Sequence, residues 1–340
     1  MKVSEVYYEL PNELLAREPR EVKGEKRSDS RLLIMDRKNQ TVSHKSFCNI
    51  IDYLEPGDAL VLNNSKTIKA DLIGWYASEK RINIQLAGIL SDGNWQAYSF
   101  ADGLKEGKKV SFGDGKLTGT LLSCTQGRIW EIKFDQDNVL ELLDEVGRPI
   151  MSPYVNKKYD IEYYQNVYAS KAGSAELPAA GRHFSNELLE EIEKKGVHIV
   201  YVTLHTGLSS IEVSSENFEE HEMHEEQIEI SEETAKILNT VRANGKRVFG
   251  VGTTVVRTLE TVADNSGYVK PYRGYSKLYI YPGYKFKMVD AFITNFHGRT
   301  SSRIAMAAAF TGKDLLMHGY QEAIEKKYLF YEFGDATLTI

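Results

Sequence analysis

The sequence has few cysteines and no long apolar run. Only Cys48 and Cys124 occur in 340 residues, far apart and outside any Cys-x-x-Cys pattern, which argues against a disulfide framework or a thiolate zinc site. The longest apolar stretch, residues 304–310, is too short to cross a bilayer. No apolar run follows the first charged residues, so we predict a cytoplasmic protein with neither export nor membrane insertion.

An excess of positive charge is also lacking. The chain has 42 Lys and Arg against 48 Asp and Glu, a net charge of -6. Nothing in this balance attracts nucleic acid to the whole molecule, so a tRNA partner would need a local basic patch. With 42% hydrophobic residues, the chain is long enough to bury a sizeable core and to form two domains.

Alternating patterns mark the segment from residue 71 to residue 134. Trp130, Ile132 and Phe134 fall on one side of a strand, with charged residues between them. Residues 112–115 hold two glycines, which supply the positive φ angles of a tight hairpin turn. The segment therefore predicts a small antiparallel barrel.

The hydrophobic pattern changes after residue 147. Ser185 is placed to cap a helix that stops near Gly196, and a strand is expected at residues 197–204. Ser231 begins a second cycle that leads into a strand at residues 247–251. Helices that alternate with strands predict an α/β domain.

Two apolar runs before the barrel segment, residues 32–35 and 59–62, complete that domain. The predicted fold class is therefore α/β, a larger α/β domain with an inserted small antiparallel β-barrel domain. We expect residues 1–70 and 148–340 to form the discontinuous α/β catalytic domain and residues 71–147 to form the barrel.

The sharpest local feature is a strand that runs into a glycine turn and then a helix from about Val255. Unpaired N–H groups at a helix start bind anions, and the hydroxyls of Thr253 and Thr254 add donors beside Gly252. Arg257 lies one turn further on and is a candidate partner for the same anion. The dinucleotide fingerprint is incomplete because Val255 stands where a third glycine is needed, so a purely structural turn remains the alternative.

Polar residues recur where predicted elements meet. His183 precedes a predicted helix and His205 follows a predicted strand, while Asn295 and His297 follow an apolar strand expected at residues 288–293. Such element ends form the ligand crevice of open α/β sheets. For each histidine alone, a satisfied structural hydrogen bond is the competing interpretation.

Two further features have a purely structural explanation as an alternative to a functional one. His221 and His224 are spaced to share a helical face as metal ligands, but a third ligand is missing, so we predict no metal and favour a hydrogen-bonded cleft wall. Tyr281, in the aromatic turn of residues 279–284, is a candidate to stack on an adenine ring, although aromatic residues at strand ends are more often part of the core.

Together these segments resemble the S-adenosylmethionine:tRNA ribosyltransferase-isomerase family of queuosine biosynthesis. The matches run collinearly over nearly the whole chain and include Gly252-Thr253-Thr254 and Asn295-Phe296-His297. They comprise residues 9–11, 14–19, 31–33, 56–63, 164–169, 178–184, 204–208, 220–224, 251–260, 281–284, 294–297 and 334–336.

The resemblance implies an α/β domain with an inserted barrel, S-adenosylmethionine as co-substrate and no metal. It implies transfer of the ribosyl part of S-adenosylmethionine to the aminomethyl nitrogen of 7-aminomethyl-7-deazaguanine in tRNA, which forms epoxyqueuosine and releases adenine and methionine. Positioned acids and bases serve such a route better than a protein nucleophile does. The candidate catalytic residues are His183, His205, His221 and His224, with Asp290 or Asp335 as a supporting carboxylate. The candidates for binding the donor are Gly252, Thr253, Thr254, Arg257, Tyr281, Asn295 and His297.

Several positions depart from the family pattern in charge. Asp71 replaces an arginine, residues 99–103 lack the usual barrel cations, and Glu176 stands in place of an alanine. Residues 298–302 replace a Leu-Pro-Lys-Ser-Thr stretch and are followed by Arg303. Because cations that pair with phosphates supply much of the affinity for nucleic acid, each missing cation weakens tRNA binding.

These departures leave three interpretations open. The first is a tRNA enzyme whose cations have moved to Arg182, Arg299, Arg303 and the pair Lys157 and Lys158. The second is a paralogue that uses the same donor on a small-molecule acceptor, or that simply cleaves S-adenosylmethionine. The third is a non-catalytic nucleotide-binding protein. The sequence does not determine the oligomeric state, and a monomer fits it.

Overall fold

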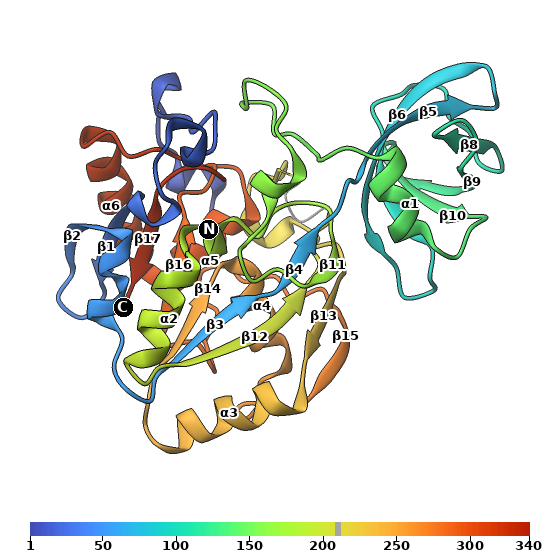
Figure 1. The fold of residues 1–340 in the computed structure, drawn as a ribbon. Coiled ribbons are helices and arrows are strands. Elements are labelled where there is room, and N and C mark those ends of the chain that lie inside the picture. The colour runs from blue at the N-terminus through green and yellow to red at the C-terminus, as the bar shows by residue number, and fades with distance from the viewer. Residues whose placement is uncertain (208–211) are drawn as a thin grey trace.

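The computed structural model describes residues 1–207 and 212–340. Its larger part is built on a mixed nine-stranded sheet, and a barrel stands to one side of it (Figure 1). Strand β3 lies in the middle and pairs in parallel with β12 and β14, and β14 pairs in parallel with β16. In sheet order the strands are β15 (Tyr272–Ser276), β13 (Glu226–Ile230), β12 (His198–Leu204), β3 (Ala59–Asn63), β14 (Val248–Val251), β16 (Ala291–Asn295), β17 (Ala336–Thr339), β1 (Arg31–Asp36) and β2 (Thr41–Ser46).

The central sheet is buried on both faces because its strands alternate between two apolar clusters. In β3, Ala59 and Val61 face one cluster, while Leu60 and Leu62 face the other. The first cluster is covered by α3 (Glu232–Ala243), α4 (Thr253–Val262), α5 (Ser302–Thr311) and α6 (Lys313–Glu325). The second is covered by α2 (Asn186–Lys194) and the 3₁₀ helix η5 (Phe47–Tyr53).

The two predicted helix caps are confirmed. The Ser185 side chain accepts a hydrogen bond from the Leu188 N–H, and the Ser231 side chain accepts one from the Thr234 N–H. Strands β12 and β14 follow these helices, within a residue of where the pattern predicts them. The other 3₁₀ helices in the described part of the chain are η1 (Val3–Val6), η2 (Asn12–Leu14), η3 (Arg20–Lys23), η4 (Arg27–Asp29), η6 (Ile161–Tyr164), η7 (Ala179–His183) and η9 (Phe218–Glu220).

The barrel is a closed ring of six antiparallel strands. They are β5 (Asp71–Tyr76), β6 (Lys80–Ile89), β7 (Trp95–Tyr98), β8 (Lys109–Phe112), β9 (Leu117–Thr125) and β10 (Ile129–Phe134), followed by α1 (Val139–Val146). Gly113 and Gly115 have positive φ angles in the β8–β9 turn, as predicted. The predicted fold class, α/β with an inserted antiparallel barrel, is confirmed.

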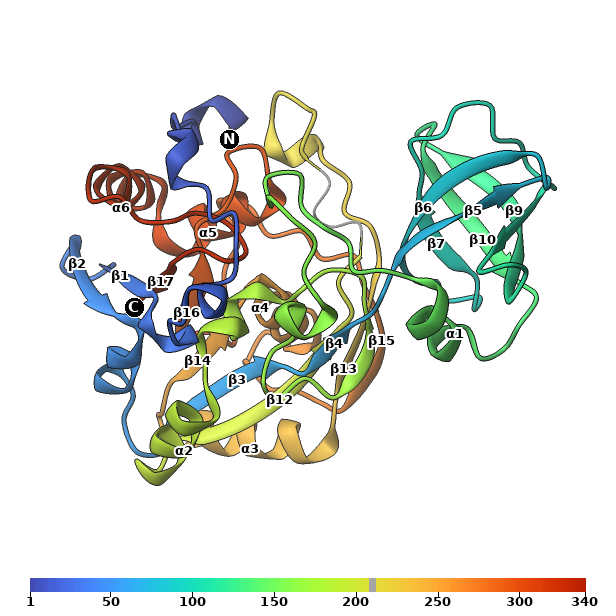
Figure 2. The ribbon, with the colours of Figure 1, turned by 45° about the horizontal axis from the view of Figure 1, so that its top comes forward.

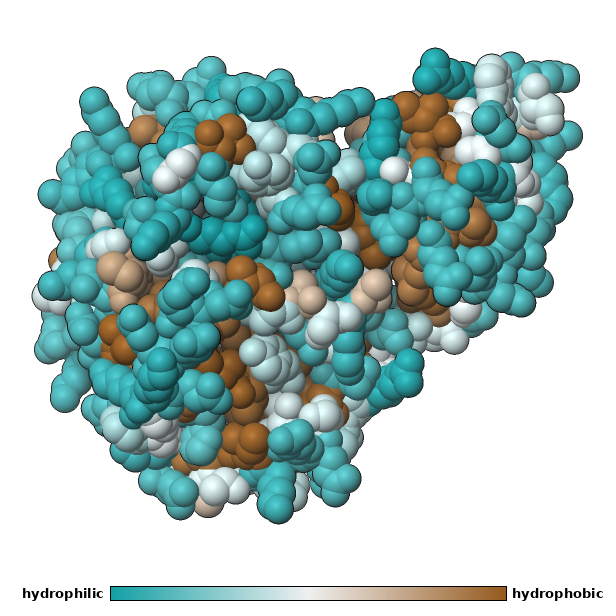
Figure 3. Space-filling model, in the orientation of Figure 1, coloured by the Kyte–Doolittle hydropathy of each residue, from teal (hydrophilic) through white to brown (hydrophobic). Residues whose placement is uncertain are grey.

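Two segments connect the barrel to the larger domain (Figure 2). One runs from β4 (Ser65–Thr67) into β5, and the other leaves α1 toward β11 (Lys171–Ser174), which pairs with β4. Apolar side chains gather where the barrel approaches the larger domain (Figure 3). The expected boundaries at residues 70/71 and 147/148 stay a prediction, because a change of architecture does not by itself define independently folding units.

One expected strand is displaced, and one helical pattern considered in the sequence is absent. The strand expected at residues 288–293 is β16, Ala291–Asn295. The N–H groups of Met288 and Val289 instead donate to the buried carboxylate of Glu260, at 2.9 and 3.2 Å. The helix that would place His221 and His224 on one face ends at Glu220.

Within residues 1–207 and 212–340, no helix is long and apolar enough to span a bilayer.

Candidate functional site

A cleft of about 1090 Å³ lies at the carboxyl ends of the parallel strands, against the barrel. Its wall on the α/β side includes Thr206, Gly207 and the start of α4, and its wall on the barrel side includes Leu86 and Phe100. The carboxyl edge of an open parallel sheet is where ligands of α/β proteins bind. The cleft is therefore the candidate functional site.

The start of α4 presents unpaired donors to this cleft. Gly252 opens the helix with a φ of 89°, and no side chain caps the helix at this residue. Gly252, Thr253 and Thr254 all line the cleft. The Thr254 hydroxyl accepts a hydrogen bond from the Asn63 side chain at 3.1 Å. Because a helix start carries free N–H groups and partial positive charge, this turn is suited to an anionic group.

Asn63 fixes this turn from the end of β3. Its side-chain N–H also donates to the Leu204 carbonyl at 2.9 Å, and its oxygen accepts from the N–H groups of Ser65 and Leu204, both at 3.1 Å. The side chain is buried, and both its amide nitrogen and its oxygen have hydrogen-bond partners. It therefore ties the ends of β3 and β12 to the start of α4.

Arg257 lines the cleft, but its guanidinium is engaged elsewhere. It forms a buried ion pair with Glu226 and donates to the carbonyls of Leu278 at 3.1 Å and Ser276 at 3.3 Å. Glu226 in turn accepts from the Gly207 N–H at 2.7 Å. The expectation that Arg257 holds a ligand anion is therefore corrected: the residue braces α4 against β13 and β15.

His205 points away from the cleft toward the β4–β11 pair. Its Nδ1 lies 2.7 Å from the Ser65 hydroxyl, which also contacts the Ser174 hydroxyl at 2.6 Å. Burial lowers the pKa of His205 to about 4, so the imidazole is neutral near pH 7. The adjacent Thr206, rather than His205, is among the lining residues.

Asn295 and His297 reach the cleft, and His183 lies beneath them. His183 is enclosed between the Ser30 hydroxyl at 2.8 Å and the Asn295 amide nitrogen at 3.3 Å, and burial lowers its pKa to about 3. Asn295 donates to the Tyr331 carbonyl at 3.0 Å, and its own Oδ1 has no hydrogen-bond partner among the described residues. That unpaired oxygen is a candidate ligand contact.

The His297 ring is a neutral group of the cleft wall. Its Nε2 lies 2.8 Å from the Thr294 hydroxyl, and burial lowers its pKa to about 3. Of the seven residues predicted to bind the donor, six line this one cleft, and only Tyr281 does not. The six are Gly252, Thr253, Thr254, Arg257, Asn295 and His297.

Tyr281, His221 and His224 do not line the cleft as predicted. His221 packs edge-on against Tyr279 with ring centres 5.4 Å apart, and Tyr281 also packs on Tyr279, with ring centres 5.3 Å apart. Met223 and Tyr279 line the cleft in place of His221, His224 and Tyr281. Burial lowers the pKa of both histidines. In the described part of the chain, no cluster of three or more His, Cys, Asp or Glu side chains is arranged to hold a metal ion.

The two predicted supporting carboxylates lie outside the cleft. Asp290 pairs with Arg242 at 3.0 Å and accepts from the Val248 N–H at 2.8 Å, at the amino end of β14. Asp335 pairs with Arg20 and accepts from the N–H groups of Leu329 and Arg31, both at 2.8 Å. Both side chains stabilise the backbone, which corrects their assignment to proton transfer.

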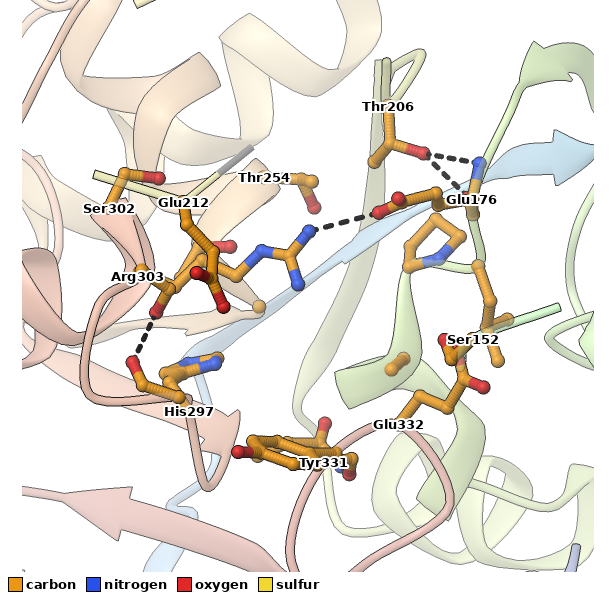
Figure 4. A pocket seen from close by; sticks show the side chains of 18 of the residues that line it. Ser152, Glu176, Thr206, Glu212, Thr254, His297, Ser302, Arg303, Tyr331 and Glu332 are labelled. Atoms are coloured by element: carbon orange, nitrogen blue, oxygen red, sulfur yellow. Dashed lines mark hydrogen bonds and ion pairs between the residues drawn. The ribbon is translucent and has the colours of Figure 1, made fainter. Parts of the chain in front are cut away.

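The cleft contains acidic and basic residues that sequence reasoning missed. Glu176 and Arg303 form an ion pair at 3.0 Å, and Glu212, Tyr331 and Glu332 also line the cleft (Figure 4). Burial and the nearby Glu176 carboxylate raise the pKa of Glu332 to about 7. Glu176 and Arg303 both depart from the family pattern, and this departure is the sequence feature that marks the two positions as unusual.

Three of the cations proposed to bind tRNA phosphates already contact other residues of the protein. Arg182 is buried against Glu21 and the Tyr163 carbonyl, with its guanidinium over the Phe333 ring, so it is unavailable to a phosphate. Arg303 is paired in the cleft. Arg299 stacks over the Tyr7 ring at 4.5 Å.

These features define a class of protein: an α/β protein with an inserted barrel, whose cleft at the sheet edge offers a helix start to an anionic ligand. The comparisons specify the family. A family model described as queuosine biosynthesis protein matches residues 3–339, and the chain belongs to this family.

Two curated relatives and one solved structure match over nearly the full length. The S-adenosylmethionine:tRNA ribosyltransferase-isomerase of Caldanaerobacter subterraneus is 46% identical, and that of Halothermothrix orenii is 42% identical, each over 100% of both chains. The crystal structure of the S-adenosylmethionine tRNA ribosyltransferase from Thermotoga maritima is similar with a TM-score of 0.57 and 35% identity, over 99% of this chain and 100% of that one.

Proposed function

We propose that this protein is an S-adenosylmethionine:tRNA ribosyltransferase-isomerase acting in the cytoplasm. It moves the ribosyl moiety of S-adenosylmethionine to 7-aminomethyl-7-deazaguanine in tRNA, which forms epoxyqueuosine and releases adenine and methionine. The observation that carries this proposal is the end-to-end similarity, at 41–46% identity, to relatives that bear this name. The comparisons give no support to a small-molecule acceptor, to simple cleavage of the donor or to a non-catalytic role.

The donor would bind at the start of α4. The free N–H groups there, with the hydroxyls of Thr253 and Thr254, suit the methionine carboxylate. Asn295 Oδ1 and the neutral His297 ring offer hydrogen bonds to the nucleoside without adding charge. When bound, S-adenosylmethionine supplies the ribosyl group and a sulfonium that acidifies the neighbouring carbon.

The barrel wall offers a platform for the tRNA. The Phe100 side chain is 63% exposed, lines the cleft and packs edge-on against Tyr98 at 4.8 Å. The Arg128 guanidinium lies over the Phe100 ring at 5.5 Å. Unpaired bases of RNA stack on exposed aromatic rings of this kind, and a neighbouring cation attracts the phosphates. We assign this surface to the nucleotides that flank the modified base.

The test of the function follows adenine and methionine. Purified protein is incubated with S-adenosylmethionine and with tRNA that carries either the aminomethyl deazaguanine or guanine at the same position. Release of both products only with the deazaguanine tRNA is the expected result. Release that is independent of tRNA, or no release with either tRNA, would contradict the proposal.

Replacing Phe100 by alanine is expected to weaken tRNA binding. Loss of one stacked base costs about 1–3 kcal/mol, which corresponds to a rise of roughly 5- to 150-fold in the KM for tRNA. The affinity for S-adenosylmethionine should stay unchanged. The matched control is Trp75→Ala, which removes an aromatic ring that is 49% exposed on β5 and does not line the cleft. Equal KM values for the two variants would contradict the assignment.

A further inference from the structure

Glu332 lies in a tightly held turn between α6 and β17. The preceding residue, Tyr331, has a φ of 75°, a left-handed conformation that costs energy for a residue with a side chain. The Tyr331 carbonyl accepts a hydrogen bond from the Asn295 side chain, and the Tyr331 ring packs on the Tyr154 ring with centres 4.9 Å apart. The Glu332 N–H donates to the Tyr154 hydroxyl at 3.4 Å. The turn therefore holds the Glu332 side chain in the cleft wall, close to Ser152 (Figure 4).

Among residues 1–207 and 212–340, no cation forms an ion pair with the Glu332 carboxylate. Its Oε1 is buried without a hydrogen-bond partner among the described residues. The two arginines that face it are engaged, Arg182 with Glu21 and Arg303 with Glu176. A buried carboxyl oxygen without a partner carries a large desolvation cost, which a cationic ligand would remove. The same cleft therefore offers both a cation site and the proposed donor site.

We propose that Glu332 binds the aminomethyl group of the acceptor base and removes its proton before the amine attacks. The inference rests on the function proposed above. The acceptor enters as an ammonium, which pairs with the carboxylate. One proton then moves from nitrogen to the Glu332 carboxyl, which leaves a neutral amine with a free electron pair and a neutral carboxylic acid. In the overall transfer the amine forms the new carbon–nitrogen bond to the ribosyl carbon, and the bond from that carbon to adenine breaks. Adenine leaves with the electron pair and takes the second proton that the amine nitrogen gives up, so no other reactant is needed.

The electrostatic surroundings suit this role. Burial first, and then repulsion from Glu176, raise the pKa of Glu332 to about 7, against the opposing effects of the Ser152 hydroxyl and the guanidinium groups of Arg182 and Arg303. The Tyr154 and Tyr164 phenols also lie near, and burial raises the pKa of both, so they stay neutral. A base is most effective when its pKa is close to the working pH. Because only the ionised form accepts a proton, the rate should fall as the pH drops below about 7.

The experiment measures kcat/KM for tRNA between about pH 5 and pH 9, with the acid limb expected near the Glu332 pKa. Glu332→Gln is expected to lower kcat/KM by about 100-fold and to abolish that limb, since loss of a general base typically costs 10²–10⁴-fold. The matched control is Glu325→Gln, an exposed carboxylate on α6 that should keep the wild-type profile. An acid limb that persists unchanged in Glu332→Gln would overturn the inference.

A second variant decides the matter if Glu332→Gln does not fold. Glu176→Gln removes the repelling charge and leaves Arg303 without its partner, so both changes lower the pKa of Glu332. The acid limb should move to lower pH, and a limb that stays in place would overturn the inference. Failure of the inference differs from failure of the function, because wild-type protein that releases no adenine with the deazaguanine tRNA refutes the function itself.

Discussion

Replacing Arg257 by methionine is expected to lower the free energy of unfolding by about 3–5 kcal/mol, as is typical when one partner of a buried ion pair is removed. Methionine keeps most of the apolar stem but leaves the Glu226 carboxylate buried without its cation. The two side chains are only 5% and 2% exposed, so water cannot replace the missing partner. The carbonyls of Leu278 and Ser276 would also lose a donor. Urea unfolding of the two proteins measures the difference.

Two controls separate charge burial from loss of packing. Arg242→Met removes the same group from a pair with Asp290 whose members are 33% and 34% exposed, and should cost less than about 1 kcal/mol. Adding Glu226→Gln to Arg257→Met should recover part of the loss, because the unpaired charge is then gone while the Gly207 N–H keeps an acceptor. A double variant less stable than Arg257→Met would show that the buried charge is not the cause.

The second large effect is expected at Gly207, where the α/β domain touches the barrel. A Cβ atom at this position would lie 2.3 Å from the Ala87 carbonyl oxygen, so the backbone of β6 or the segment at Gly207 must move. Leu86 and Ala87 form part of the cleft wall. Gly207→Val should therefore lower kcat/KM for tRNA by about tenfold or more, since a shift of about 1 Å in an active site can cost 100-fold.

The comparison that tests this expectation uses a second glycine. At Gly115, in the β8–β9 turn, an added Cβ meets nothing within 4 Å, although the φ of 89° is strained for other residues. Gly115→Ala should cost about 1 kcal/mol of stability and leave turnover unchanged. Gly207→Ala should fall between wild type and Gly207→Val in kcat/KM. Wild-type turnover in Gly207→Val would show that this contact does not shape the cleft.

Local chemistry explains what the sequence predicted well. Ser185 and Ser231 each satisfy a helix N–H three residues on, an interaction that depends only on neighbours in the chain. The alternation in β10 and the glycine turn at residues 112–115 are equally local. Gly252 lies between a parallel strand and a helix, at the edge of the sheet where the cleft lies.

The failures concern partners that are distant in sequence. Nothing near Asp290 or Asp335 shows that Arg242 and Arg20 occupy them. Likewise, Glu176 and Arg303 meet across 127 positions, and each alone looks like a surface charge. The strand expected at residues 288–293 begins only at Ala291, because Glu260 accepts hydrogen bonds from the backbone N–H groups of Met288 and Val289. Pairs between side chains that are distant in sequence determine these roles, and such pairs cannot be recognised from a single sequence.

The insertion of the barrel into the sheet domain has a consequence for how the chain folds. Every barrel strand pairs with strands from residues 71–134, whereas Val61 in β3 pairs with Val200 and Gly250, and Leu33 in β1 pairs with Thr337. Short loops close faster than long ones, so the barrel should form well before the sheet. Trp75, Trp95 and Trp130, the only tryptophans in the sequence, all lie in the barrel. Tryptophan fluorescence during refolding therefore reports the inserted barrel, while far-ultraviolet circular dichroism follows both parts of the molecule.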